Sequence, residues 1–255
     1  MNSVFWFRRD RRVSDNPALL AACDFSAGAS VYPIYPIPSS FETLSPIRAW
    51  SLVESLKELA KKLDSNLSVK TGSVAALVLE AAEKSNSKKV FATRAFDTDG
   101  MLEQAEVAEL LFAKGIALEL VDSYYAVTPG SVNKDDGTAV RVYTPFYKRW
   151  LVHGWDKPFP APSFKSWEKL PNWEGIPTPS QPAPYKVIAG EDFALRTFER
   201  FKKRALRDYS ENRNRADLSG TSHLSHALAH GEIHPRTLLS QLGNSQGEEV
   251  FRKEI

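Results

Sequence analysis

Val4-Phe5-Trp6-Phe7 is a short apolar run near the start of the chain, and Ser14-Asp15-Asn16-Pro17-Ala18-Leu19 follows it after an arginine-rich turn. Consecutive apolar residues rich in β-formers are typical of a buried parallel strand. Asn or Asp before a proline marks a helix start, because the side chain caps free N–H groups and proline suits the first helical position. This stretch therefore predicts a strand that leads into a helix.

The same alternation of strand and helix continues to about residue 125. Further strands are expected at 30–37, 67–69, 89–93 and 116–121, and further helices at 45–63, 74–82 and 99–114. Strands joined by single helices favour right-handed crossovers between parallel neighbours. We therefore predict the α/β class, with a five-stranded doubly wound parallel sheet in the order 3-2-1-4-5.

The rest of the sequence divides into a connector and a helical part. There are eight prolines between Pro158 and Pro184, so residues 131–190 are expected to form an extended connector after an α/β domain at 1–130. Residues 191–255 are expected to begin an all-α domain, with helices at 191–212, 224–229 and 236–242. The helical pattern at 248–255 has no C-terminal cap, which predicts a chain cut within this domain.

Composition narrows the classes of protein to consider. The formal charge is +2 and the pI is about 8.5, so any basic surface has to be local. Cys23 is the single cysteine, which excludes an intrachain disulfide and a Cys-rich metal site and fits a reducing compartment. No apolar run approaches the roughly 18 residues that span a bilayer. These features predict a cytoplasmic protein with no membrane association.

Several common motifs are absent. No Gly-x-Gly-x-x-Gly follows the first strand, and the chain has neither a P-loop nor a Gly-x-Ser-x-Gly elbow. His223, His226, His230 and His234 lie close in sequence but lack Cys or carboxylate partners at ligand spacing, so no metal site is predicted. An α/β module of the flavodoxin kind that binds a nucleotide or an electron carrier is one alternative, with its ligand at the carboxyl ends of the strands.

The most informative polar stretch runs from Tyr209 to Ser225. Tyr209 and Arg213 are four residues apart and are expected on one helix face. Gly220-Thr221-Ser222 is expected at the start of the next helix, where N–H and hydroxyl groups form an anion site that suits a pyrophosphate. The alternative is that Thr221 and Ser222 are simple N-caps.

Three blocks of the sequence resemble the DNA photolyase/cryptochrome family. Arg8-Arg9-Asp10 with residues 14–19 is similar to the family's opening, and Val142–Trp150 is similar to its Phe-Thr-Pro-Phe block. Gly220–Ser225 followed by Gly231–Arg236 resembles its flavin block. The blocks occur in the family's order over nearly the whole chain and look most like the N-terminal portion of class I deoxyribodipyrimidine photo-lyases.

The resemblance implies an N-terminal domain that can hold a light-harvesting antenna and a helical domain that holds FAD. Arg213 matches a DNA-facing position of the family. An antenna is expected at the carboxyl end of the sheet, near residues 8–12 and 38–47. Residues 94–100 lack the Asn-Glu pair of folate-binding members, so a deazaflavin or flavin is favoured over a folate. The matching flavin-contacting positions are Tyr209, Thr221, Ser222, His223, Leu224 and Ser225.

Three residues depart from the family's pattern. Arg11 stands where leucine is usual, His223 where many members have arginine, and His234 where serine is usual. The catalytic residues of the family, including its electron-relay tryptophans, are expected beyond residue 255. The tryptophans present here are expected to be core or connector residues.

The function that the resemblance implies is light-dependent repair of cyclobutane pyrimidine dimers by electron transfer from reduced FAD, with UV-damaged DNA as partner and no obligate protein partner. The alternative is a cryptochrome-type blue-light photosensor without repair activity. The 255-residue chain by itself is expected to bind FAD poorly and to be inactive. Leu195, Phe198 and Leu206 are expected to be partly exposed, because their packing partners are missing.

Overall fold

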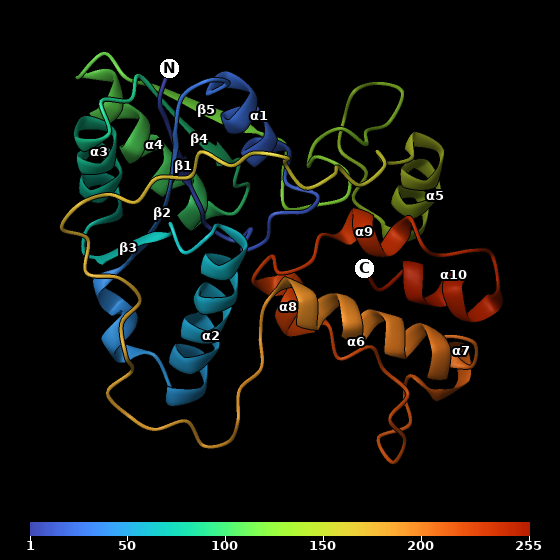
Figure 1. Cartoon of the computed structure of the whole chain (residues 1–255). Helices are drawn as coiled ribbons and strands as arrows, with labels where there is room; N and C mark the ends of the chain where they lie inside the picture. The colour runs from blue at the N-terminus through green and yellow to red at the C-terminus, as the bar shows by residue number, and fades with distance from the viewer.

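A five-stranded parallel sheet forms the core of the first half of the chain (Figure 1). The structure is a computed structural model that describes residues 1–255. The sheet has the order β3-β2-β1-β4-β5, and this order confirms the prediction. The strands are β1 (Ser3–Trp6), β2 (Val31–Ile37), β3 (Ser68–Thr71), β4 (Lys89–Thr93) and β5 (Ala117–Val121).

Helices cover both faces of the sheet, because alternate residues of β1 point to opposite sides. Phe5 and Phe7 pack with α1 (Pro17–Phe25) and α2 (Pro46–Lys62). Val4 and Trp6 pack with α3 (Val74–Lys84) and α4 (Thr98–Phe112) on the other face. A 3-10 turn, η1 (Ser39–Thr43), leads into α2. The sheet is therefore doubly wound, as predicted.

The proline-rich connector runs along the outside of the sheet domain. It contains α5 (Tyr143–His153), a helix with no buried residue, and then a long extended segment. Trp167 forms a parallel bridge with Val31 at the sheet, and Trp167, Leu170 and Trp173 are all buried. The connector is thus fastened to the α/β part through its aromatic and leucine side chains.

The last part of the chain is helical, but its first helix is shorter than predicted. α6 (Glu191–Arg204) ends eight residues before the predicted Asn212, and the single turn α7 (Tyr209–Asn212) follows after a break. The N–H groups of Ala205 and Leu206 both donate to the Phe201 carbonyl, which closes the helix. The remaining helices are α8 (Ser225–Ala229), α9 (Pro235–Leu239) and α10 (Gln246–Arg252).

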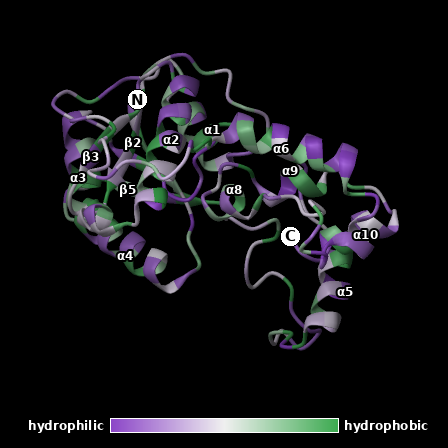
Figure 2. Cartoon of the chain, turned by 90° about the horizontal axis from the view of Figure 1, so that it is seen from below, coloured by the Kyte–Doolittle hydropathy of each residue, from purple (hydrophilic) through white to green (hydrophobic).

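The expected exposure of Phe198 and Leu206 is wrong, because the helical part builds its own core. Both side chains are buried, and Leu195 is half-buried beside them. Phe251 of α10 and Leu224 complete the cluster. Figure 2 shows hydrophilic and hydrophobic residues alternating along the ribbon of α6, as expected for a helix with one face in this core. None of the helices is long and apolar enough to cross a membrane.

Candidate functional sites

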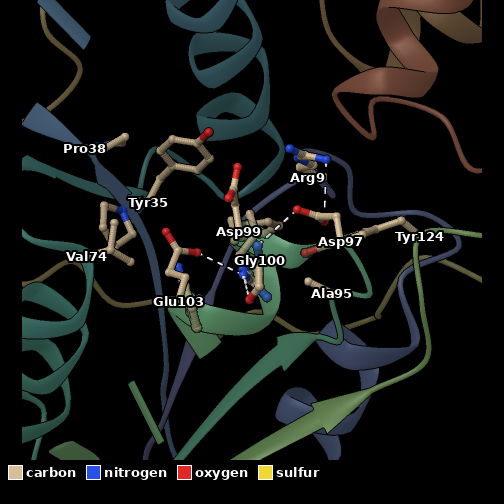
Figure 3. A pocket seen from close by; sticks show the side chains of 14 residues that line it. Arg9, Tyr35, Pro38, Val74, Ala95, Asp97, Asp99, Gly100, Glu103 and Tyr124 are labelled. Carbon is tan, nitrogen blue, oxygen red and sulfur yellow. Dashed lines mark hydrogen bonds and ion pairs between the residues drawn. The ribbon is translucent and has the colours of Figure 1, made fainter. Parts of the chain in front are cut away.

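The first candidate site is a cavity of about 290 Å³ at the carboxyl end of the sheet (Figure 3). It lies beside the Arg8–Arg12 turn and Pro38, where the ligand of the α/β part was predicted. The ends of β1 and β2, the starts of α3 and α4, and Tyr124 form its walls, and one side is open. Its lining residues are Trp6, Phe7, Arg8, Arg9, Tyr35, Pro36, Pro38, Val74, Ala95, Asp97, Asp99, Gly100, Glu103 and Tyr124.

A buried carboxylate fixes the turn that forms one wall of this cavity. Asp10 is fully buried and accepts hydrogen bonds from the Arg8 N–H at 2.7 Å and from the Thr93 hydroxyl at 2.6 Å. These bonds hold the turn after β1 against the end of β4. The charge-assisted bonds to Asp10 are of the strong kind, so the wall is preorganised.

The charged side chains of the cavity bond mostly to one another. The Arg8 guanidinium donates to the Gly100 carbonyl at 2.8 Å and to Glu103 at 2.9 Å, and it lies 4.5 Å above the Trp6 ring. Asp97 caps α4 by accepting from the Gly100 N–H at 3.0 Å. Burial raises the pKa values of Tyr35 and Tyr124, so both phenols stay neutral.

The second candidate site is a hollow of about 240 Å³ between α6 and the loop before α8. Arg200 and Arg204 are four residues apart and line it from the helix. The hydroxyl residues Thr197, Ser219, Thr221 and Ser222 also line it, together with His223. Neither arginine was among the predicted site residues, although their spacing puts them on one side of α6.

The loop at 220–224 differs from the predicted helix start. α8 begins only at Ser225, and its N-cap Leu224 makes no side-chain cap. Thr221 and Ser222 are therefore not the N-caps of this helix. The hydroxyl of Ser222 accepts from the Leu224 N–H at 3.4 Å, and His223 adopts a φ of 55°. The loop exposes its polar atoms because it does not form helical hydrogen bonds.

The structure does not bring all the predicted site residues into this hollow. Tyr209 is buried, with its ring edge-on to Phe201 at 5.5 Å. Leu224 is also part of the hydrophobic core, whereas Ser225 is exposed outside the hollow. Arg213 forms an ion pair with Glu254. Thr221, Ser222 and His223 are the predicted residues that line the hollow.

The second hollow fits part of the FAD that the resemblance implies. Guanidinium and hydroxyl groups are suitable partners for a pyrophosphate. Its volume of about 240 Å³ is below the roughly 300–1,000 Å³ of pockets that enclose whole ligands of this kind. The residues present can therefore hold the phosphates but do not enclose the rings.

Buried polar contacts join the α/β part to the helical part between the two sites. Asp15 is buried and accepts from the Arg236 guanidinium at 3.2 Å and from the Thr237 hydroxyl at 2.9 Å. Glu191 accepts from two N–H groups of the chain before α1, those of Val13 and Ser14, at 3.0 Å each. The segment before α1 is thus bonded both to the start of α6 and to α9.

The turn at 8–12 also contacts the segment after α8. The buried Arg12 donates to the Gly231 carbonyl at 3.1 Å, and Arg11 donates to the His230 carbonyl at 3.3 Å. His234 is buried in the same junction. No group of three or more His, Cys, Asp or Glu side chains gathers closely enough to hold a metal ion. The junction is a contact between the α/β part and the helical part. It joins the turn that lines the first site to the start of α6, the helix that lines the second site.

Sequence comparison matches residues 3–163 to the family model described as DNA photolyase. The deoxyribodipyrimidine photo-lyase of Agrobacterium fabrum is 32% identical over 99% of this chain and 56% of that protein. A corresponding protein of Thermus thermophilus is 33% identical over 99% of this chain and 57% of that protein. Cryptochrome-1 of Arabidopsis thaliana is 27% identical over 99% of this chain. The chain thus spans little more than half the length of these photo-lyases.

Solved structures give the same picture of the fold. A class III photolyase from Agrobacterium tumefaciens has a TM-score of 0.80 and 26% identity, and the match covers 99% of this chain and 56% of that one. A cryptochrome from Synechocystis has a TM-score of 0.83 and 20% identity, covering all of this chain and 59% of that one. The second similarity is one of fold alone.

Proposed function

This chain belongs to the DNA photolyase family, and on that ground we propose that the whole protein repairs cyclobutane pyrimidine dimers in DNA with light, by electron transfer from reduced FAD. The observation that carries the proposal is the alignment of two curated photo-lyases with nearly the entire chain. UV-damaged DNA is the proposed partner. A cytoplasmic location is part of the proposal. It is supported by the single cysteine, Cys23, which is buried and unpaired, as is common in a reducing compartment.

The second hollow is the proposed contact for the phosphates of FAD. When bound, the reduced flavin supplies the electron that splits the dimer. Arg200 and Arg204 neutralise the phosphate charge, and the hydroxyls of Thr221 and Ser222 orient it. Tyr209 is buried in the hydrophobic core that also contains Leu224, and it does not line the hollow. Further walls of the flavin site come from outside residues 1–255.

Arg213 is proposed to contact the DNA backbone. Its guanidinium is paired with Glu254, and the side chain keeps 31% of its surface exposed. A DNA phosphate would have to displace the Glu254 carboxylate from Arg213. This exchange is feasible because a guanidinium binds either anion.

The cavity at the carboxyl end of the sheet is proposed to hold the ring system of the antenna chromophore, a deazaflavin or flavin, with the rest of the molecule outside it. The support is its position beside the Arg8–Arg12 turn and its aromatic lining. Ligands of open α/β sheets bind at the carboxyl ends of the strands, where the strand order reverses. Here β1 lies between β2 and β4, which places that reversal at the cavity.

A blue-light photosensor without repair is the second candidate function. The specific observation in its favour is the similarity to Cryptochrome-1 over nearly the whole chain. The two functions share the fold and the proposed FAD contact, so they differ only in what happens to DNA under light.

One experiment separates repair from photosensing. The full-length protein, with its flavin reduced, is mixed with a UV-irradiated oligonucleotide and exposed to blue light. We expect dimers to revert; intact dimers with bound flavin would favour the photosensor.

The double variant Arg200→Gln/Arg204→Gln should lose at least about tenfold in FAD affinity, because two charge-assisted bonds are removed. Lys203→Gln removes a charge from the same helix outside the hollow and should change little. Equal FAD affinity in the double variant and the control would contradict the assigned phosphate contact.

A further inference from the structure

We propose that the cavity at the carboxyl end of the sheet selects an uncharged heteroaromatic ring with N–H donors and discriminates against the same ring carrying a phosphate. This inference rests on the proposed antenna role and names the class of chromophore. It depends on which charges of the cavity are already satisfied and which remain available to a ligand.

The buried cation of the cavity is not available to a ligand anion. The Arg8 side chain is 6% exposed, and its guanidinium bonds to the Gly100 carbonyl, to Glu103 and to the Gln104 side chain at 2.8, 2.9 and 3.2 Å. Its flat face is stacked over Trp6. A phosphate could pair with Arg8 only by breaking these bonds, which already satisfy a buried guanidinium.

The start of α4 points at the cavity but is occupied by carboxylates of the chain itself. The first turn of a helix normally attracts anions. In α4 this position is taken by Asp97, which caps the Gly100 N–H at 3.0 Å, and by Asp99 one residue into the helix. The remaining cation, Arg9, is 61% exposed and already lies 3.6 Å from Asp97.

The groups left for a ligand are therefore hydrogen-bond acceptors and aromatic faces. Asp97, Asp99 and Glu103 surround Gly100 at the cavity wall (Figure 3). Three carboxylates stand against two guanidinium groups, and both guanidinium groups are paired. Tyr35 and Tyr124 add ring surface but no charge, because their phenols stay protonated.

This arrangement matches one ligand chemistry. Ring N–H groups, such as the imide of an isoalloxazine or deazaflavin, donate well to carboxylates. A phosphate brings one to two further negative charges close to the carboxylates, where like-charge repulsion and desolvation oppose binding. The cavity thus favours the nucleoside-like or free form of a chromophore over its nucleotide.

Riboflavin and FMN test this selection, because they share one ring and differ only in the phosphate. Each is titrated into the 255-residue chain at low salt, and binding is followed by quenching of flavin fluorescence. We expect riboflavin to bind at least about tenfold more tightly than FMN. The difference should shrink as salt is added, because screening weakens the repulsion.

Variants test whether the carboxylates of the cavity cause the preference for riboflavin over FMN. Asp99→Asn should improve FMN binding relative to riboflavin, whereas Glu106→Gln, an exposed position of α4 outside the lining, should leave the ratio unchanged. Val74→Trp fills the cavity without altering its charges and should abolish binding of both flavins.

The failures of the two proposals are distinguishable. FMN binding as tightly as riboflavin, with both lost in Val74→Trp, would overturn the charge selection and leave the antenna site standing. Binding of neither flavin, or binding unaffected by Val74→Trp, would overturn the antenna role of the cavity and the selection with it. Dimer repair by the full-length protein in light that the flavin absorbs directly is independent of both outcomes.

Discussion

His234 is satisfied in its neutral form at the junction between the α/β part and the helices. Its Nδ1 accepts from the Arg236 N–H at 3.1 Å, and its Nε2 lies 3.2 Å from the Ser123 carbonyl, to which it can donate. Asp15 is 3.4 Å from Nδ1, but that nitrogen already accepts a bond, so we do not treat this contact as an ion pair. Burial, followed by the charges of Arg12 and Arg236, lowers the pKa of His234 well below 6.5.

This lowered pKa predicts a loss of stability in acid. Below about pH 6.5 the unfolded chain protonates His234 and the folded chain does not, so the free energy of unfolding falls as the pH drops. We expect His234→Asn, which keeps an oxygen to cap α9, to reduce the slope between pH 6.5 and 5 by up to about 1.4 kcal/mol per pH unit. Urea unfolding at several pH values measures the slope. His153→Asn at an exposed position is the control, and equal slopes in both variants would refute the assignment.

Gly231 is a position where only glycine fits. It has a φ of 66°, and an added Cβ would lie 1.8 Å from the Arg9 carbonyl oxygen. Gly115 has nearly the same φ, 67°, with no atom within 4 Å of an added Cβ. We expect Gly115→Ala to cost about 1 kcal/mol from backbone strain alone. Gly231→Ala should cost at least about 3 kcal/mol, because the junction has to open.

Urea midpoints of the two glycine variants measure this difference. Because backbone strain is common to both, the excess cost at Gly231 reports the contact between the Arg8–Arg12 turn and the helical part. Equal midpoints would mean that this contact does not contribute to stability.

At the scale of single elements, α10 closes the core of the helical part. The ring of Phe251 lies 4.8 Å from that of Phe201 and 5.3 Å from that of Tyr209, and its side chain is buried. Phe251→Ala should cost about 3–5 kcal/mol, because it leaves a cavity between α6, α7 and α10. Phe112→Ala is the matched control, since Phe112 is 85% exposed and should change stability by less than about 0.5 kcal/mol.

Chemical unfolding of both phenylalanine variants, followed by circular dichroism, checks this prediction. A small effect of Phe251→Ala would show that α10 does not hold the helices together.

Local signals in the sequence were sufficient for the sheet and its helices. The strand order agrees with the prediction because strand and helix alternate with short connections, which leaves few topologies. The start of α1 was also predictable, and Asn16 caps it by accepting from the Leu19 N–H at 3.1 Å. The alternation of elements and the helix cap are both encoded by residues that are close together in the sequence, so they can be predicted without knowledge of the tertiary fold.

The break after α6 could not be predicted in the same way. The apolar spacing continues past Arg204 as if the helix did, whereas in the structure α10 packs against the residues just after the break. Gly247 packs so closely there that an added Cβ would lie 2.0 Å from the Leu206 carbonyl oxygen. A contact between residues so distant in sequence has no local signal. The burial of Phe198 was missed for the same reason, because its partner is Phe251.

The candidate sites were predicted in part. The cavity beside the Arg8–Arg12 turn lies where the strand order reverses, which follows from topology. Arg200 and Arg204 were missed as lining residues of the hollow that contains Thr221, because only the tertiary fold brings the loop at 220–224 to this side of α6. Whether these residues bind FAD remains a prediction.

At the scale of the whole molecule, the 255-residue chain is predicted to bind FAD weakly and to repair no DNA by itself. The hollow that offers phosphate partners has a volume of about 240 Å³, and its lining residues reach only one part of a dinucleotide. Tyr209 and Leu224 are buried in the core and do not line the hollow.

The test compares this chain with the full-length protein, measuring flavin absorbance per chain and light-dependent reversal of dimers. We expect FAD well below one per chain and no reversal in the 255-residue chain, with both present in the full-length protein. Because the helical part has its own core, poor FAD binding by a chain that shows native helical circular dichroism would locate the deficit in the missing pocket walls. Stoichiometric FAD in the 255-residue chain would instead show that the hollow and its loop enclose the cofactor without them.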